Sequence, residues 1–211
     1  MVSFLLIKIY KMSRHQTLDI TIDDGYERLK EIIKQRGIVI KDVTLSSNRK
    51  SKFYYDIKSI INEPEGAVLI GELMLTRILK VEPKIMSVGG LESGAIAIST
   101  AIVCSCYYSR LPNTISGFFV RKSVKTYGLE KRIEGIVKDP VAVVDDVVTT
   151  GKSVLDAVTA LRNHGLNNIH IFSVIDREAE ENLLEKNNLQ YHSLFKHSDF
   201  STYIDSKLDE S

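Results

Sequence analysis

Apolar residues recur along this chain with two different spacings, which predict alternating helices and strands. Spacings of three and four residues in 23–37 and 65–80 are typical of helices, and the second segment is apolar on nearly every side, which predicts burial. A polar turn leads into an aromatic strand within 46–58. From residue 84 onward, the predicted strands are 84–88, 117–122, 141–146 and 168–176, and the predicted helices between and after them are 95–105, 152–165 and 177–188. This alternation predicts an α/β fold with a parallel sheet flanked by helices on both faces.

Polar residues gather at the points where three of these strands end. The three segments are 89–94, 145–151 and 176–177. In parallel α/β sheets, ligands bind beyond the carboxyl ends of the strands. We therefore expect the three segments to converge on one site.

Composition and charge indicate a single compact domain and give no sign of a nucleic-acid-binding or membrane-spanning protein. The chain has 211 residues, of which 44% are hydrophobic and 26% charged, as expected for one compact domain with an ample core. A net charge of +1 creates no overall field that would attract nucleic acid or a membrane surface. No apolar run approaches the roughly 18 residues that a membrane span needs.

The two cysteines and the first residues bear on the cellular compartment. Cys104 and Cys106 lie two residues apart and are poorly placed to bridge each other, so we expect reduced thiols in a cytoplasmic protein. The first residues are apolar but have neither a basic leading region nor a small-residue cleavage site. We expect a tail or a strand there, and Met12 is a second possible start.

The stretch VAVVDDVVTTGKS, residues 141–153, carries the clearest candidate chemistry. An apolar strand leads to Asp145 and Asp146, whose carboxylates only accept hydrogen bonds and suit a sugar diol or Mg²⁺-bound water. Next, Gly151 and neighbouring hydroxyl residues open a helix, whose unpaired N–H groups favour a phosphate. The spacing fits neither a Walker A loop nor G-x-G-x-x-G. Ribose 5-phosphate would suit this stretch, because its diol would bind the two acids and its phosphate would bind the start of the helix. The alternative is that the two acids only cap a turn.

A second stretch is rich in cations. Residues 121–138 contain Arg121, Lys122, Lys125, Lys131, Arg132 and Lys138. Cations placed on a pyrophosphate leaving group stabilise charge that develops in the transition state. Gly128 and Gly135 would let the segment open and close over a substrate. The alternative is a solvated charged loop.

Taken together, these motifs resemble a known family. Residues 141–153 are similar to the phosphoribosyl pyrophosphate (PRPP) motif of type I phosphoribosyltransferases. Residues 118–128 resemble the R-K-x-x-K-x-H-G loop of the orotate phosphoribosyltransferases, with Tyr127 where many members have His. Residues 46–58 resemble the family's N-terminal S-G-x-x-S-x-Y-x-D segment, with Asn48 in place of Gly and Ser46 where some members have Lys. Segment 88–97 resembles the pyrophosphate loop, with Ser93 where several relatives have Lys.

The resemblance implies a type I phosphoribosyltransferase fold with a small N-terminal hood, divided as residues 1–64 and 65–211. It implies transfer of ribose 5-phosphate from PRPP to orotate in pyrimidine (UMP) synthesis, with Mg²⁺ held mainly by PRPP and no direct protein ligand, in a cytoplasmic homodimer. The expected catalytic residues are Lys125, Asp145 and Asp146. The expected PRPP-binding residues are Arg121, Lys122, Lys125, Tyr127, Asp145, Asp146, Val147, Val148, Thr149, Thr150, Gly151, Lys152 and Ser153. The expected orotate-binding residues are Thr149, Arg177, Tyr54 and Tyr55, with the Arg177 guanidinium gripping the orotate carboxylate.

Two alternatives to this function remain open. One is a phosphoribosyltransferase for a purine or for uracil, although those bases have no carboxylate for Arg177 to bind. The other is a PRPP-sensing regulator without catalysis, but the segment before residue 46 has no basic recognition helix. We expect no nucleic-acid or membrane partner, and association with an orotidine monophosphate decarboxylase is left open.

Overall fold

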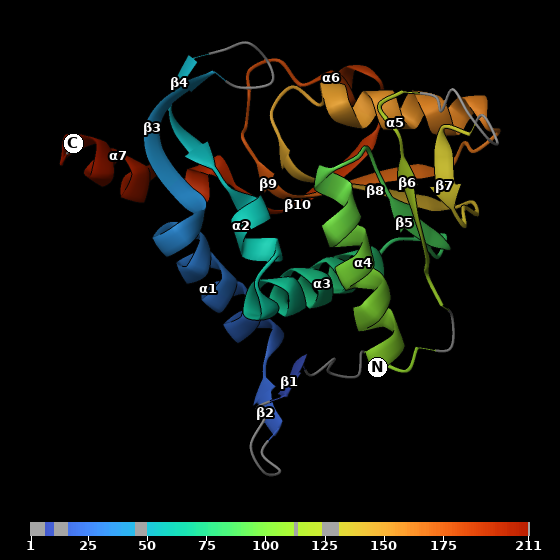
Figure 1. The fold of residues 1–211 in the computed structure, drawn as a ribbon, viewed down its shortest axis with the longest axis horizontal. Helices are drawn as coiled ribbons and strands as arrows, with labels where there is room; N and C mark the ends of the chain where they lie inside the picture. Colours follow the sequence, from blue (N-terminus) through green and yellow to red (C-terminus); the bar gives the residue numbers. More distant parts are fainter. Residues whose placement is uncertain (1–6, 11–16, 45–49, 112–113, 124–130, 211) are drawn as a thin grey trace.

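The computed structural model describes residues 7–10, 17–44, 50–111, 114–123 and 131–210. Its centre is a six-stranded sheet in the order β10-β9-β8-β5-β6-β7 (Figure 1). The strands are β5 (Ser87–Gly89), β6 (Ser116–Val120), β7 (Ile133–Gly135), β8 (Val141–Val148), β9 (Ile169–Asp176) and β10 (Gln190–Lys196). All neighbouring pairs are parallel except β6 with β7, which is antiparallel. The predicted parallel sheet is confirmed.

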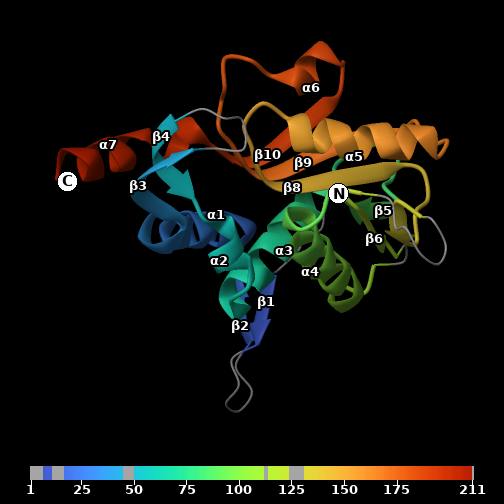
Figure 2. The same cartoon turned by 45° about the horizontal axis from the view of Figure 1, so that its top comes forward.

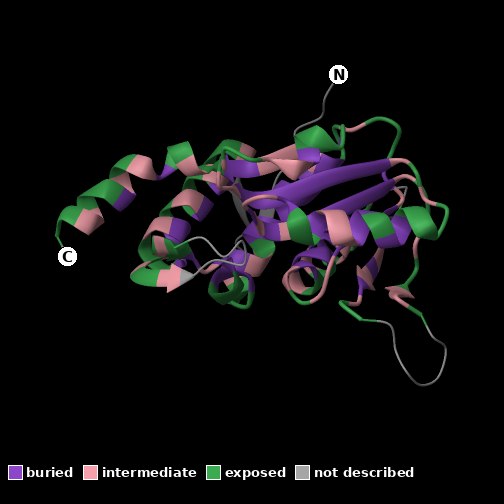
Figure 3. Ribbon diagram, turned by 90° about the horizontal axis from the view of Figure 1, so that it is seen from above, coloured by how far each residue is buried: buried purple, intermediate pink, exposed green. Residues whose placement is uncertain are grey.

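Helices cover both faces of this sheet (Figure 2). They are α3 (Pro64–Ile78) and α4 (Gly94–Tyr108) on one face, and α5 (Lys152–Asn163) and α6 (Leu183–Lys186) on the other. Alternate residues of β8 enter two separate apolar clusters, Val144 on the α3–α4 side and Val143 on the α5 side. Figure 3 shows that the central strands are buried along most of their length. This burial on both faces explains why β8 and β9 read as nearly continuous apolar runs.

The N-terminal hood consists of α1 (Ile22–Ile32), a π-helical turn (Ile33–Gly37), β3 (Ile38–Thr44), β4 (Lys50–Tyr55) and α2 (Ile57–Ile61). The predicted helix 23–37 is confirmed as α1 with the π-helical turn, ending at Gly37 as expected. A capping box starts α1, because Thr21 precedes the helix and exchanges hydrogen bonds with Asp24. Strand β3 pairs antiparallel with β4 and was not predicted from the sequence.

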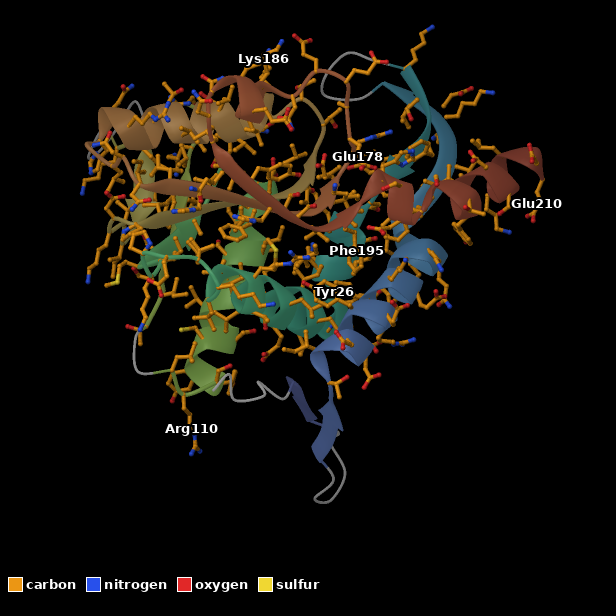
Figure 4. The ribbon with its side chains drawn as sticks, turned by 180° about the vertical axis from the view of Figure 1, so that it is seen from behind. Tyr26, Arg110, Glu178, Lys186, Phe195 and Glu210 are labelled. Atoms are coloured by element: carbon orange, nitrogen blue, oxygen red, sulfur yellow. The ribbon has the colours of Figure 1, made fainter. Side chains whose placement is uncertain are left out.

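The hood and the rest of the chain share one apolar cluster. Leu29 and Tyr55 from the hood lie in the same cluster as Leu73 of α3 and Phe195 of β10. Figure 4 shows Tyr26 and Phe195 side by side, and their ring centroids are 5.8 Å apart in an edge-to-face arrangement. The expected boundary at residue 64 therefore separates two segments of sequence that are packed together by a common core.

Elsewhere, the structure differs from the sequence expectations in several elements. The expected helix 177–188 shortens to α6, because Glu178 adopts a left-handed φ of 50° and Asn182 caps a helix beginning at Leu183. The polar stretch 122–138 contains the edge strand β7. The C-terminal elements β10, a 3₁₀ turn (His197–Asp199) and α7 (Ser201–Asp209) were not predicted.

The first described residues form a small hairpin of β1 (Ile7–Tyr10) and β2 (Thr17–Ile20), which agrees with the strand alternative for this segment. Cys104 and Cys106 lie on α4, the first exposed and the second buried, and they form no disulfide in the described part of the chain. None of the helices in the described ranges is long and apolar enough to cross a membrane.

Candidate functional site

The loops that follow β5, β8 and β9 meet at one edge of the sheet (Figure 1). Gly94, at the start of α4, lies against both central acids, since a Cβ built on it would be 3.0 Å from Asp145 Oδ1 and 3.1 Å from Asp146 Oδ1. The backbone N–H of Arg177, just past β9, donates to the Val148 carbonyl at 2.9 Å. The predicted convergence of the three strand ends is confirmed.

Asp145 and Asp146 lie within β8, because this strand continues to Val148 instead of ending at the acids. Their side chains lie close to each other, since Oδ1 of each acid is near the position that a Cβ on Gly94 would occupy. The Asp146 N–H donates to Asp145 Oδ1, and the Val147 N–H donates to Asp146 Oδ1, each at 3.0 Å. Burial, followed by repulsion from Asp146, raises the pKa of the Asp145 carboxyl well above its usual range.

Lys58 of α2 supplies a cation to this pair. Its Nζ lies 2.7 Å from Asp146 Oδ2, and the Asp146 side chain is only 13% exposed. The sequence analysis did not identify Lys58, because no local motif joins a residue of the hood to a distant strand. The only signal in the sequence was its position two residues after Asp56, within the stretch that resembles the base-binding segment of the family.

A small cavity of about 50 Å³ opens where β8 passes into α5. Its lining comes from the predicted phosphate segment together with one acid, namely Asp145, Val147, Val148, Thr149, Thr150, Gly151, Lys152 and Ser153. Gly151 has a φ of +81°, a conformation that glycine adopts without strain, and it precedes the first turn of α5. The first N–H groups of α5 have no helical acceptor, so this end of the helix favours an anion. The geometry suits a compact anionic group such as phosphate.

The basic segment joins β6 to β7 and lies beside the loop that follows β5. The Arg121 N–H donates to the Arg132 carbonyl at 2.8 Å, and the Arg121 guanidinium lies 3.6 Å from Glu134. The Lys122 N–H donates to Glu92 at 2.8 Å, which joins the basic segment to the predicted pyrophosphate loop. Lys125, Tyr127 and Gly128 lie outside the described residues.

Arg177 extends from β9 to the hood. Its Nη2 donates to Ser51 Oγ at 3.2 Å, and its guanidinium carbon lies 4.5 Å from the centroid of the Phe53 ring. Its guanidinium therefore contacts β4 of the hood. Burial lowers the pKa of Arg177 from its ordinary value, but an arginine remains charged at neutral pH.

The two tyrosines expected to contact a base are placed differently. Tyr54 is 37% exposed, whereas Tyr55 is only 1% exposed. The Tyr55 hydroxyl lies 2.9 Å from His197 Nδ1, and its ring packs edge-to-face on Phe200. The Tyr55 side chain thus joins the hood to the C-terminal segment, and its ring centroid lies 5.6 Å from the guanidinium carbon of Arg177. A contact of Tyr55 with a base stays a prediction. The expected residues Ser46, Ser47 and Asn48 lie outside the described residues.

Comparison with known proteins is consistent across sequence and structure. Residues 116–206 match the phosphoribosyl transferase domain family. The chain is 41% identical over 180 residues to an orotate phosphoribosyltransferase of Aquifex aeolicus, covering 82% of this chain and 96% of that protein. A Mycobacterium tuberculosis orotate phosphoribosyltransferase, solved in complex with PRPP, superposes with a TM-score of 0.65 at 30% identity, over 84% of this chain and 99% of that one. A phosphoribosyltransferase from Corynebacterium diphtheriae superposes with a TM-score of 0.70 at 27% identity. That comparison covers 84% of this chain and 98% of the other.

Proposed function

The chain belongs to the orotate phosphoribosyltransferase family, and we propose that it transfers the ribose 5-phosphate group of PRPP to N1 of orotate. In this reaction the bond between ribose C1 and the pyrophosphate oxygen breaks, a C1–N1 bond forms, and the N1 proton of orotate is released to pyrophosphate or solvent. Orotidine 5′-monophosphate and pyrophosphate then leave. One observation carries the proposal: a pair of carboxylates, an anion cavity at a helix start and a guanidinium lie together at one sheet edge.

The sugar phosphate would occupy the edge of β8 and the start of α5. Asp145 and Asp146 would accept hydrogen bonds from the two ribose hydroxyls. The cavity lined by 147–153 would hold the 5-phosphate through backbone N–H groups and through the Thr and Ser hydroxyls. Because the transition state is expected to resemble an oxocarbenium ion, the role of these groups is to place charge and to orient the sugar.

Orotate would lie between the end of β9 and strand β4. Arg177 would bind the orotate carboxylate with its planar fork, since its guanidinium already lies over Phe53 at this position. Thr149 would donate from the β8 side, and Tyr54 belongs to the strand that bounds the base. Tyr55 would contribute through its backbone and through its packing beneath that strand.

The pyrophosphate would be bound by the segment that joins β6 to β7. Arg121 and Lys122 are part of this segment, and Lys122 is hydrogen bonded through its backbone to Glu92 of the neighbouring loop. Lys125 is our candidate for the contact that strengthens as the leaving oxygen gains charge, with Tyr127 beside it in sequence.

Mg²⁺ is expected to accompany PRPP. The described residues contain no group of three or more His, Cys, Asp and Glu side chains arranged to hold a metal ion. Asp145 and Asp146 would accept hydrogen bonds from the waters of an ion that is otherwise coordinated by the oxygens of PRPP. When bound, Mg²⁺ would neutralise charge on the pyrophosphate.

The family likeness also supports a homodimer in the cytoplasm, acting in pyrimidine synthesis. Exposed apolar surface at the end of α4, where Tyr107 and Tyr108 are 77% and 75% exposed, supports self-association. Two cysteines without a disulfide in the described residues suit a reducing compartment. Light scattering of the purified chain tests the dimer, because a monomeric mass at micromolar concentration would contradict it.

Steady-state kinetics with PRPP and Mg²⁺ test the reaction itself. We expect turnover of orotate to exceed that of adenine, guanine, hypoxanthine and uracil by at least about 100-fold, because only orotate presents a carboxylate to Arg177. Lys125→Ala should lower kcat by about 100-fold or more, the usual cost of losing one charged transition-state contact. Absence of orotate turnover by the wild-type chain would refute the proposed function.

A further inference from the structure

We infer that Lys58 is a positioning residue for the PRPP site, which holds Asp146 in place through its ion pair and thereby connects the hood to the ribose-binding acids. The inference rests on the proposed function and adds a residue to which neither the family likeness nor the motifs assign a role. Asp146 is the acid through which Lys58 would act.

Both oxygens of the Asp146 carboxylate have a defined partner. Oδ1 accepts the Val147 N–H at 3.0 Å, and Oδ2 lies 2.7 Å from Lys58 Nζ. Each carboxylate oxygen retains a second acceptor position, so the carboxylate can still receive a ribose hydroxyl. With one oxygen held by the backbone and the other by the lysine, the plane of the carboxylate is defined before the sugar arrives.

Charge gives Lys58 a second effect. PRPP is strongly anionic, and the Asp146 carboxylate alone would repel it. The Asp146 side chain is 13% exposed and Lys58 retains 48% exposure, so the pair is shielded on one side only. The ammonium offsets the negative charge of Asp146 while leaving the hydrogen-bonding capacity of this acid available.

The position of Lys58 in the fold explains how it connects two parts of the site. Lys58 lies on the first turn of α2, which begins directly after β4 and is capped by Asp56. Strand β4 carries Ser51, to which Arg177 donates a hydrogen bond, and Phe53, over which the Arg177 guanidinium lies. The segment that borders the proposed base site is therefore joined to the ribose acids by a single rigid turn of helix.

Direct binding and kinetics of three variants test this role. In Lys58→Met, which retains most of the apolar stem, we expect the dissociation constant and the KM for PRPP to rise about 10- to 100-fold, the factor for losing a hydrogen bond to a charged group. The KM for orotate should change less than about threefold. Lys58→Arg should restore PRPP affinity to within about fivefold of the wild type. Lys80→Met, an exposed lysine beyond the end of α3, provides the same change of charge away from the site and should behave as wild type.

A double-mutant cycle distinguishes positioning from direct contact with substrate. If Lys58 acts through Asp146, then Lys58→Met should have little further effect on kcat/KM for PRPP in an Asp146→Asn background. A full additional loss in that background would mean that the lysine contacts the substrate directly, and this result would overturn the inference. Unchanged PRPP affinity in Lys58→Met, or an equal loss in Lys58→Arg, would also overturn it.

The proposed function can fail independently of this inference. PRPP binding, measured by titration calorimetry with Mg²⁺ and without any base, does not depend on which base is the acceptor. If the wild type binds PRPP but does not turn over orotate, the assigned reaction is wrong while the weaker binding of Lys58→Met still supports the role of the lysine. If orotate is turned over and Lys58→Met binds PRPP normally, only the inference fails.

Discussion

The guanidinium carbon of Arg177 lies 4.5 Å from the centroid of the Phe53 ring, while the backbone N–H of the same residue donates to Val148. One arginine therefore touches the hood with its side chain and the strand of the paired acids with its backbone. A cation stacked on an aromatic ring is held in a defined plane but keeps its N–H donors available at the edge. This is the arrangement that a planar carboxylate substrate requires.

Replacing Arg177 should weaken the binding of orotate and leave the binding of PRPP unchanged. In Arg177→Gln we expect the KM for orotate to rise about 10- to 100-fold, because a charged hydrogen-bonding partner of the carboxylate is lost. The dissociation constant for PRPP alone should stay within about twofold of the wild type. Arg162→Gln, at an exposed position on the last turn of α5, is the matched control. A KM for orotate within about threefold of the wild type in Arg177→Gln would contradict the assignment.

Substituting Gly94 should reduce activity without reducing stability. The new methyl group of Gly94→Ala would lie 3.0 Å from Asp145 Oδ1 and 3.1 Å from Asp146 Oδ1, which is closer than side chains normally pack. Alanine favours a helix by up to about 1 kcal/mol over glycine, so the Tm should hold or rise. We expect kcat/KM for PRPP to fall by about tenfold or more, measured beside Gly117→Ala, whose methyl group meets only Val103 at 3.4 Å. Wild-type activity in Gly94→Ala would show that the acids tolerate displacement.

The raised pKa of Asp145 predicts a stability that depends on pH. Burial beside Asp146 raises this pKa to about 8, so the folded chain holds a proton that the unfolded chain releases near pH 4. Stability contributed by the protonated carboxyl is present at low pH and is lost as the pH rises from about 4 to 8. Asp145→Asn should therefore raise the Tm at pH 8, by about 2–4 °C for each kcal/mol gained, with a smaller gain at pH 5.

The PRPP affinity of Asp145→Asn is the control for the measurement of its thermal stability. Asp145→Asn should lose PRPP affinity at the same pH at which it gains stability, because a ribose-binding carboxylate is absent. Thermal unfolding of both forms at several pH values between 4 and 9 would show the trend. A Tm difference that is constant over this range would contradict a raised pKa for Asp145.

Gly151 should be far less tolerant of a side chain than Gly165, although both adopt a positive φ. A Cβ on Gly151 would lie 2.7 Å from Leu184 Cγ, whereas a Cβ on Gly165 meets nothing within 4 Å. Gly165→Ala should cost about 1–2 kcal/mol, the penalty for a left-handed backbone conformation. Gly151→Ala should cost more and should also weaken PRPP binding, because the phosphate loop must move. Equal Tm values for the two variants would contradict a steric role for Leu184.

Several features of the fold could be predicted because they are local. The apolar periodicity located α3, α5, β8 and β9 to within a few residues, and the small polar residues after Val148 indicated the phosphate cavity. Strand β7 could not be anticipated from its own sequence, because its three residues become a strand only by pairing with β6. Helix α6 is short for a related reason: the Leu183 N–H donates to the Thr150 carbonyl at 3.0 Å, which ties the start of this helix to the phosphate loop.

Alternating strands and helices were enough to predict which polar segments meet at one edge of a parallel sheet, although β8 continues two residues beyond the acids. The pattern of the chain alone was therefore enough to assign Asp145, Asp146 and Arg177 to a common site. Two other features depend on the folded chain: Lys58 pairs with Asp146, and the Tyr55 side chain is buried against the C-terminal segment. These contacts join segments far apart in the chain, and their geometry is set by how the hood packs on the sheet, which no local pattern encodes.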